Sequence, residues 1–407
     1  MELMTLIIFI LVYIGMLLGS WPGLAIDRTG IALLGAIAFM ELQGLSAEQM
    51  VSYIDFPSII ILFSFMIISA QFYYSGFYTY TIETVQQWNL SPKFLLFIVI
   101  FISAILSALL INDIVCLALT PLVIKACAHK KFNPVPFLLG LACASNIGSG
   151  LTLIGNPQNL LIGQVLQIPF GQYLLYSSIP CILGIFVTWF IILQQTRNQW
   201  LLEKAETKFE SIPFNAWQSL KGIFILVILL ILFFVNEIPR DKISLAAAGF
   251  LLLSRRMASQ TMLNFIDWQL LVLFIGLFIV NKSLLNTFSV DTFHRILTSY
   301  HIDLNSPAWI FLFSTVLSNL VSNVPAVMLL LPLIQGSFEG SLLALTSTLA
   351  GNMFLIGSIA NLIVVSQAKK HGIHIDWKRH LKVGLPVALM TLLLTALWMY
   401  YLSPESS

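Results

Sequence analysis

The chain has 407 residues, of which 58% are hydrophobic and only 9% are charged, against about 25% charged residues in soluble domains. The mean hydropathy is +0.92, which excludes a soluble protein of this length. The apolar stretches reach the ~20 residues that a spanning helix needs, and they lack the short alternating pattern of outer-membrane strands. The composition therefore predicts an all-α polytopic membrane protein that is embedded in the lipid bilayer. The apolar start of the chain lacks a positive region and a cleavage motif, so we expect a retained first helix.

Apolar segments follow one another along the chain, at roughly 4–20, 29–45, 57–76, 94–126, 135–165, 172–193, 219–235, 243–256, 268–288, 307–335, 341–366 and 381–402. Two of them carry a polar tip near the middle, Asn112-Asp113 in 94–126 and Ser322-Asn323 in 307–335. We interpret both as re-entrant hairpins, because non-helical backbone at membrane depth is tolerated only beside protein or water. Ten full spans remain, five in each half of the sequence.

The basic residues predict the orientation. With the N-terminus outside, all of the 20 Lys and Arg residues except Arg240, Lys242, Lys282 and Arg295 fall on the inner side, as the positive-inside rule requires. Both termini are then outside in a multi-pass protein of the cell inner (plasma) membrane. We expect Lys282 to extend to the membrane interface, or else to act as a counter-charge for an anion.

The two halves of the sequence resemble each other. Residues 103–122 (SAILSALLINDIVCLALTPL) match 314–333 (STVLSNLVSNVPAVMLLLPL) at an offset of 211, and LIGNPQNLLI at 153–162 matches LIGSIANLIV at 355–364 at an offset of 202. We also pair Asp55 with Asp267, and Asp27-Arg28 with Asp241-Lys242. Because each half has an odd number of spans, the second is predicted to insert upside down. The predicted parts are a first inverted repeat (1–193), a cytoplasmic linker (194–218) and a second inverted repeat (219–402).

Polar residues interrupt the spans 135–165 and 341–366, which we therefore expect to be broken helices. Matched glycine-bearing interruptions in two halves point to the binding site of a transporter. Freed carbonyls can coordinate Na⁺, and amides at helix N-termini favour an anion. Close helix packing is the alternative reason for small residues. The predicted substrate- and ion-binding residues of the hairpin tips and broken helices are Asn112, Asp113, Ser145, Asn146, Gly148, Ser149, Thr152, Gly155, Asn156, Asn159, Ser322, Asn323, Gly351, Asn352, Gly357, Ser358 and Asn361.

Asp113 is the only acid deep within an apolar segment, and its counterpart at the offset of 211 is Val324. An ionisable residue at that depth is a functional hypothesis by default. It can bind Na⁺ or carry a proton, or it can cap the second hairpin helix. Asn112, Asp113, Asn146 and Asn323 are the expected surroundings of a Na⁺ ion. The four cysteines show no disulfide or metal spacing, so we expect packing residues, or a thiol site for a species such as arsenite.

The runs IND-(x)₇-P at 111–121, ASNIGSGLTLIGNPQNLLIG at 144–163 and GSIANLIVV at 357–365 resemble the ion transporter superfamily over essentially the whole chain. That superfamily includes arsenite permeases, divalent anion:sodium symporters, citrate transporters and a class of Na⁺/H⁺ antiporters. The resemblance implies a homodimer in which a transport domain moves like an elevator against a scaffold domain. The symporters carry Ser-Asn-Thr at each hairpin tip. This chain has Ile-Asn-Asp and Val-Ser-Asn-Val-Pro instead, which disfavours a dicarboxylate and resembles the arsenite-permease type.

We therefore predict an ion-coupled secondary active transporter of a small inorganic or organic anion or oxyanion, with Na⁺ or H⁺ as coupling ion and no other cofactor. An arsenite/antimonite efflux permease with proton coupling and a Na⁺/H⁺ antiporter are the alternatives, and an ion channel is a further one. We do not expect an enzyme, because no HExxH motif or Ser–His pair occurs in the spans. We also expect no nucleic-acid partner.

Overall fold

The computed structural model describes the whole chain except residues 197–199, 202–211, 236–237, 304–305 and 404–407. In this part of the chain the regular elements are helices, with two isolated bridge pairs and no strand. Seven of the described helices are long and apolar enough to cross a membrane. The predicted all-α membrane class is therefore confirmed. Most of the predicted linker 194–218 lies outside the described residues.

The helices of the first half are α1 (Glu2–Leu18), α2 (Arg28–Gln43), α3 (Ala47–Ser52), α4 (Phe56–Tyr74), α5 (Phe77–Gln87), α6 (Pro92–Leu109), α7 (Asn112–His129), α8 (Pro134–Gly150), α9 (Pro157–Val165) and α10 (Phe170–Gln195). Those of the second half are α11 (Ala216–Phe234), α12 (Arg240–Leu252), α13 (Ser259–Leu263), α14 (Trp268–Thr287), α15 (Val290–Ser299), α16 (Pro307–Val321), α17 (Asn323–Leu330), α18 (Ser337–Ala350), α19 (Ile359–Lys370) and α20 (Trp377–Tyr401).

Local sequence signals fix where these helices begin and end. Side-chain oxygens of Asp55, Asn156 and Asp267 accept hydrogen bonds from the first turns of α4, α9 and α14, which satisfies amides that lack an intrahelical partner. Prolines occupy the first turns of α6, α8, α9 and α16, where their missing N–H costs nothing. The helix ends are thus set by short-range chemistry even though the spans are apolar throughout.

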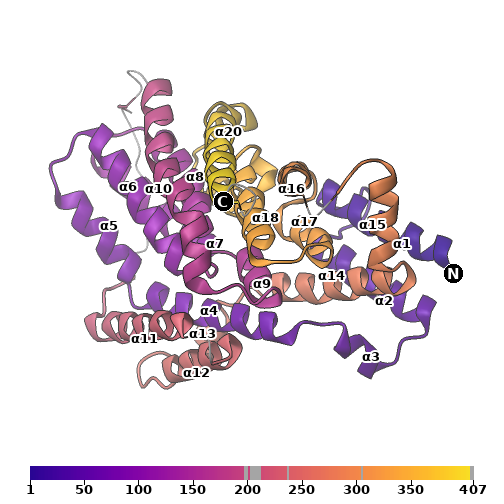
Figure 1. Ribbon diagram of the computed structural model, residues 1–407. Helices are drawn as coiled ribbons and strands as arrows, with labels where there is room; N and C mark the ends of the chain where they lie inside the picture. The colour runs from indigo at the N-terminus through magenta and orange to yellow at the C-terminus, as the bar shows by residue number, and fades with distance from the viewer. Residues whose placement is uncertain (197–199, 202–211, 236–237, 304–305, 404–407) are drawn as a thin grey trace.

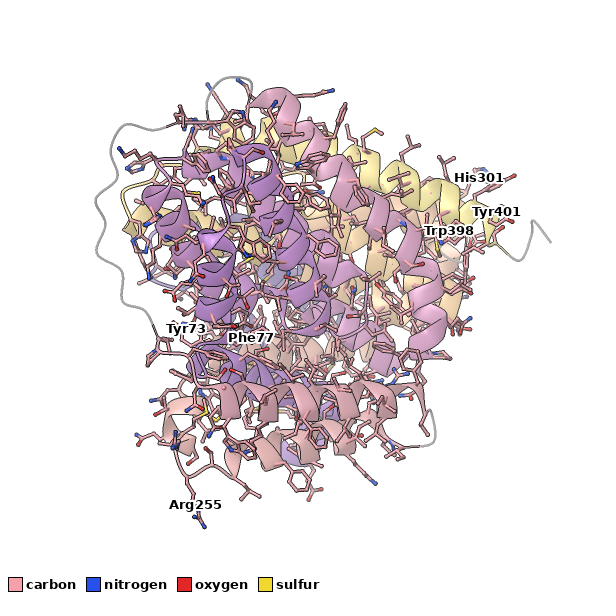
Figure 2. The ribbon with its side chains drawn as sticks, turned by 90° about the vertical axis from the view of Figure 1, so that its left-hand side faces the viewer. Tyr73, Phe77, Arg255, His301, Trp398 and Tyr401 are labelled. Carbon is pink, nitrogen blue, oxygen red and sulfur yellow. The ribbon has the colours of Figure 1, made fainter. Side chains whose placement is uncertain are left out.

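The helices form two groups by their packing, and Figure 1 shows α4, α11 and α12 of the first group below the upright helices of the second. We call α1, α2, α4, α11, α12 and α14 the lower layer, in which α2 packs on α14 and α12 packs on α4. We call α6 to α10 and α16 to α20 the upper bundle, in which α6 packs on α8 and α10 packs on α20. Figure 2 shows α11 and α12 lying across the foot of the upright helices, with Tyr73 and Phe77 at the junction.

The expected interruptions coincide with helix breaks. Segment 94–126 is α6 and α7 separated by Leu110 and Ile111, and segment 307–335 is α16 and α17 separated by Ser322. Ser322 has a φ of 77°, a conformation that few residues other than glycine adopt. Span 135–165 breaks into α8 and α9, and span 341–366 into α18 and α19. These breaks supply backbone groups that no helix satisfies.

One sequence pairing between the halves does not coincide with the helix starts. Asp27 caps α2, but the residue before α12 is Pro239, so the first helical residues that correspond are Arg28 and Arg240, at an offset of 212. The same offset joins Asp55 and Asp267, whose φ and ψ are −78° and 84° against −77° and 83°. The pairs Asp27-Arg28 and Asp241-Lys242 have similar residue types, but Asp27 precedes its helix whereas Asp241 lies within the first turn of α12.

Asn281 of α14 joins the lower layer to the hairpin helix α17. Pro332 has no N–H, so the carbonyl of Met328, four residues earlier, lacks its usual helical donor. The Asn281 Nδ2 donates to that carbonyl at 3.1 Å, and the Asn281 Oδ1 accepts from the Tyr13 hydroxyl at 2.9 Å. One buried amide therefore compensates for the proline and ties α1 and α14 to α17.

Replacing Asn281 with alanine should lower the free energy of unfolding by about 1 to 3 kcal/mol, because the Met328 carbonyl and the Tyr13 hydroxyl would both lose a buried partner. Thermal unfolding of the purified protein in detergent measures the effect. Asn286→Ala on the same helix is the control, since its bond to the Tyr53 hydroxyl is exposed. Equal stability of the two variants would contradict the assignment.

Candidate functional site

A small polar cavity lies where both hairpin tips and both broken helices meet. Its volume is only about 10 Å³. The lining residues are Asn112, Asp113, Pro157, Gln158, Ser322, Asn323, Val324, Ser358 and Ile359. The structure thus brings together five predicted site residues from three separate segments: Asn112, Asp113, Ser322, Asn323 and Ser358. No lysine, arginine or histidine is among the lining residues.

Each lining residue belongs to the beginning of a helix. Asn112 and Asp113 open α7, Pro157 and Gln158 open α9, Asn323 and Val324 open α17, and Ser358 and Ile359 open α19. Figure 1 shows α9 and α17 near the centre of the molecule. A helix N-terminus carries about half a positive charge and unsatisfied amides. Four such ends around one space create a positive potential without a single basic side chain.

Asp113 supplies the only formal charge among the residues that line the cavity. It is half-buried, and it lies in the first turn of α7, where the helix dipole favours a carboxylate. The matching residue at the other tip, Val324, is buried and apolar. The cavity is therefore symmetric in its helix ends and asymmetric in its charge.

The two broken helices hold each other through reciprocal hydrogen bonds. Asn146 of α8 donates to the Asn361 Oδ1 of α19 at 3.1 Å, and Thr348 of α18 donates to the Asn159 Oδ1 of α9 at 3.1 Å. The two bonds correspond at the offset of 202, which relates Asn146 to Thr348 and Asn159 to Asn361.

The same shift relates the residues that cap α9 and α19. Ser358 donates to the Asn146 Oδ1 at 2.8 Å, and Asn156 donates to the Thr348 Oγ1 at 3.2 Å. Each N-cap residue therefore reaches across to the other broken helix.

Asn159 and Asn361 satisfy the carbonyls that the breaks set free. The Asn159 Nδ2 donates to the carbonyls of Ser149 and Thr152 at 3.3 and 3.2 Å. The Asn361 Nδ2 donates to the carbonyls of Gly351 and Phe354 at 2.8 and 3.3 Å. Both asparagines are fully buried, so they form the wall behind the cavity and do not line it.

The glycines at the breaks allow close approach of the backbone. A Cβ on Gly155 would lie 2.5 Å from the Ser149 Cα and 2.6 Å from the Ser107 carbonyl oxygen. The Gly155 carbonyl accepts from the Asn112 N–H at 2.9 Å. On the other side, the Asn323 side-chain amide donates to the carbonyls of Gly357 and Ser347 at 2.9 and 3.0 Å. Each hairpin tip is thus bonded to the break of one helix.

The remaining predicted residues lie behind the cavity. Gly148 packs directly on the α6 backbone at Ala104. Ser145 accepts a bond from the Cys116 thiol at 3.0 Å, Asn352 accepts from Asn146 at 2.9 Å, and Thr152 donates to the Ala108 carbonyl at 2.5 Å. Close packing and hydrogen bonds behind the cavity engage these residues. Lys282 is exposed on α14 and is not part of the cavity.

Sequence reasoning missed Gln158 and Thr348. Gln158 lines the cavity and donates to the Thr348 Oγ1 at 3.2 Å. Thr348 matches Asn146 at the offset of 202, so the repeat contained the signal. The signal was not recognised because a threonine in an apolar helix usually bonds only to a carbonyl of the preceding turn of the same helix.

Two larger hollows on the periphery have a different character. The hollow between α11 and α12, lined by Phe224, Ile228 and Phe250, and the hollow between α14 and α17, lined by Leu284, Leu330 and Leu333, are almost wholly apolar. Apolar walls offer no means to recognise a polar solute. The small cavity at the helix ends is therefore the candidate site.

Replacing Thr348 with valine should destabilise the upper bundle by about 1 to 3 kcal/mol, because the amides of Asn156 and Gln158 would lose a buried acceptor and the Asn159 Oδ1 a donor. The midpoint of thermal unfolding reports this. Thr395→Val is the control, because that hydroxyl bonds only to Thr391 within its own helix. A Thr348 variant as stable as the control would show that the network is dispensable.

A family model described as a citrate transporter (CitMHS) matches residues 4–350. The "46 kDa membrane protein" of Mycobacterium leprae is 26% identical, with 93% of this chain and 95% of that protein covered. The "Putative transporter arsB" of Dictyostelium discoideum is 25% identical (91% and 87% covered), and the "Silicon efflux transporter LSI3" of Oryza sativa subsp. japonica is 24% identical (91% and 92% covered).

The crystal structure of the YdaH transporter of Alcanivorax borkumensis matches with a TM-score of 0.59 at 14% identity, covering 98% of this chain and 97% of that chain. The described fold is therefore that of a known membrane transporter. Because the family model spans most of the sequence, the chain belongs to the citrate transporter (CitMHS) family of the ion transporter superfamily.

Proposed function

We propose that this transporter carries a small oxyanion or its parent oxyacid, in exchange or symport with a coupling ion. The observation that carries the proposal is the convergence of four helix N-termini on one small polar cavity. Helix N-termini bind negative charge and the oxygen atoms of oxyacids through backbone amides. These amides are neutral, so they can bind a solute without the strong salt bridge that a basic side chain would form, and they can release it again.

The charge balance argues against a large polyanion. Citrate would bring three carboxylates beside the Asp113 carboxylate, with no basic side chain among the lining residues to offset them. The small volume of the cavity, about 10 Å³, also favours a compact solute. Arsenite, antimonite or silicic acid has hydroxyl groups that can donate to Asp113 and oxygens that can accept from the helix ends. The names of the Dictyostelium and rice relatives agree with a solute of this size.

Asp113 is the proposed coupling residue. A carboxylate at membrane depth can bind a proton on one side of the membrane and release it on the other. The apolar Val324 at the matching position cannot do this, so only one of the two tips would couple. Proton-coupled efflux of arsenite or antimonite is the form of the proposal that the Asn-Asp tip favours.

Coupling to Na⁺ is the second candidate, and one observation favours it. The Ser107 Oγ and the Asn112 Oδ1 are buried and have no hydrogen-bond partner among the described residues. Both flank Gly155, since the Ser107 carbonyl lies against it and the Asn112 N–H donates to it. Oxygens of this kind would hold Na⁺ beside Asp113. A Na⁺/H⁺ antiporter without an anion would use the same groups.

We propose that the upper bundle moves against the lower layer, and that the two halves are inverted repeats. The hydrogen bonds related by the offset of 202 support the repeat. The packing between the layers supports movement, because α9 packs on α4 whereas α19 makes no comparable contact with α14 in the described residues. Such one-sided packing is expected if the upper bundle packs against α4 in one access state and against α14 in the other. The homodimer, the external termini and a plasma-membrane location remain part of this proposal.

Transport into proteoliposomes tests the function. Arsenite, antimonite, silicic acid, sulfate and citrate would each be offered under an imposed pH gradient and, separately, an imposed Na⁺ gradient. The proposal requires saturable flux with counterflow for one of the small oxyacids. Flux of citrate alone would contradict the charge argument, and flux without saturation or counterflow would identify a channel.

The Asp113→Asn variant should lose pH-driven flux by about a hundredfold while still exchanging substrate in counterflow, because an amide cannot carry the proton. Val324→Asn is the matched control at the other tip, and it should retain coupling. Unchanged pH-driven flux in the Asp113 variant would exclude proton coupling through this residue. Loss of Na⁺-driven flux alone would assign it to the cation.

A further inference from the structure

Arg240 makes a polar bridge between the lower layer and the upper bundle. It is the first residue of α12, and its guanidinium donates to the carbonyls of Gly163 and Ile168 at 3.1 and 2.6 Å. Gly163 lies in the last turn of α9, and Ile168 follows it. Phe170 packs beside this bridge onto Phe233 and Phe234 of α11, with ring centroids 5.9 and 5.2 Å apart.

The end of α9 is built to accept a cation from another helix. Gln167 has a φ of 50°, and the Ile168 N–H bonds back to the Gly163 carbonyl, which is the Schellman ending of a helix. The last turn of α9 contains no basic residue, although a cation is favourable there. Arg240 supplies that charge from the lower layer.

The bridge acts directly on the cavity. Helix α9 is only nine residues long, and its first residues, Pro157 and Gln158, line the cavity. A short helix transmits a displacement of one end to the other because its intrahelical hydrogen bonds keep its length and shape fixed. Whatever holds the Gly163 end therefore holds one of the four helix ends at the site.

The matching arginine of the first half does not make such a bridge. Arg28 opens α2, and its Nε donates to the Met16 carbonyl of α1 at 3.1 Å, within the lower layer. The matching helix end is that of α19, where the Ile373 N–H bonds to the Ala368 carbonyl in the same way. The last turn of α19 has its own cations, Lys369 and Lys370, so it has no need of an arginine from another helix.

We propose that Arg240 is a latch that holds α9 against the lower layer in one of the two access states, and that the latch must open for the site to face the other side. This inference rests on the proposed movement between the layers. Arg240 is a positioning residue, because it acts through α9 and is not among the residues that line the cavity. The latch is one-sided, so the two states are not held by equivalent contacts.

Distances between spin labels test the latch without any substrate. Labels on Phe250→Cys of α12 and Leu175→Cys of α10 report the separation of the layers, since both positions are exposed and the four native cysteines are buried. We expect one main distance in the parent protein. Arg240→Gln should raise the ratio of a second, longer distance about tenfold or more, and Arg240→Lys should restore it in part.

Arg28→Gln is the matched control and should leave the distance distribution unchanged. An unchanged distribution in Arg240→Gln, with or without a lower unfolding temperature, would overturn the latch. An equal shift in the Arg28 variant would also overturn it, because the effect would then not depend on the bridge to α9.

Cross-linking separates this inference from the proposed function. A flexible bismaleimide between Arg240→Cys and Gln167→Cys should abolish transport, whereas the same linker between Thr29→Cys and Gln269→Cys, both in the lower layer, should not. Thr29 bonds the Gln269 carbonyl at 3.3 Å, so that pair is within reach. Full transport in the first linked protein would refute the latch while leaving the transport activity intact. Absence of transport in the unlinked protein would count against the proposed function alone, because the spin-label distances need no substrate.

Discussion

The reciprocal bonds between the two broken helices are the interaction on which the site depends. Breaking a helix inside a membrane frees carbonyls and amides, and no water is there to satisfy them. Asn159 and Asn361 satisfy the freed carbonyls of their own breaks, and Thr348 and Asn146 hold those asparagines from the opposite helix. Each break is therefore stable only in the presence of the other, and the helix ends that line the cavity are held as one unit.

Much of this arrangement could be predicted from the sequence. The positions of both tips and both breaks follow from proline, glycine and asparagine in apolar segments, because these residues act on their immediate backbone. Family membership followed from the runs around Asn112, Gly155 and Asn361. Local chemistry and internal matching were enough for these predictions.

Contacts between distant helices could not be predicted in this way. The sequence analysis grouped most polar residues of the breaks as one site, but of those predicted residues only Ser358 lines the cavity together with the tips. Which side of a helix faces the cavity depends on its rotation, and apolar residues all round a buried helix hide that rotation. Thr348 and Arg240 were missed for the same reason, since each acts on a helix far away in the sequence. Asp27 and Asp241 were paired by residue type alone, and they differ in their position relative to the helix starts.

The two kinds of contact suggest how a rigid site and a moving protein are compatible. Inside the upper bundle, neutral amides and hydroxyls bond to buried partners on both sides of the cavity, and nothing there can change without leaving buried groups unpaired. Between the layers, the described polar contacts are few and include Arg240 to the end of α9 and Asn281 to α17. A displacement that breaks those contacts frees the Arg240 guanidinium, whose long side chain can reach water. The cost of moving the bundle is therefore much lower than the cost of deforming the site, which is the condition for carrying a bound solute across the membrane intact.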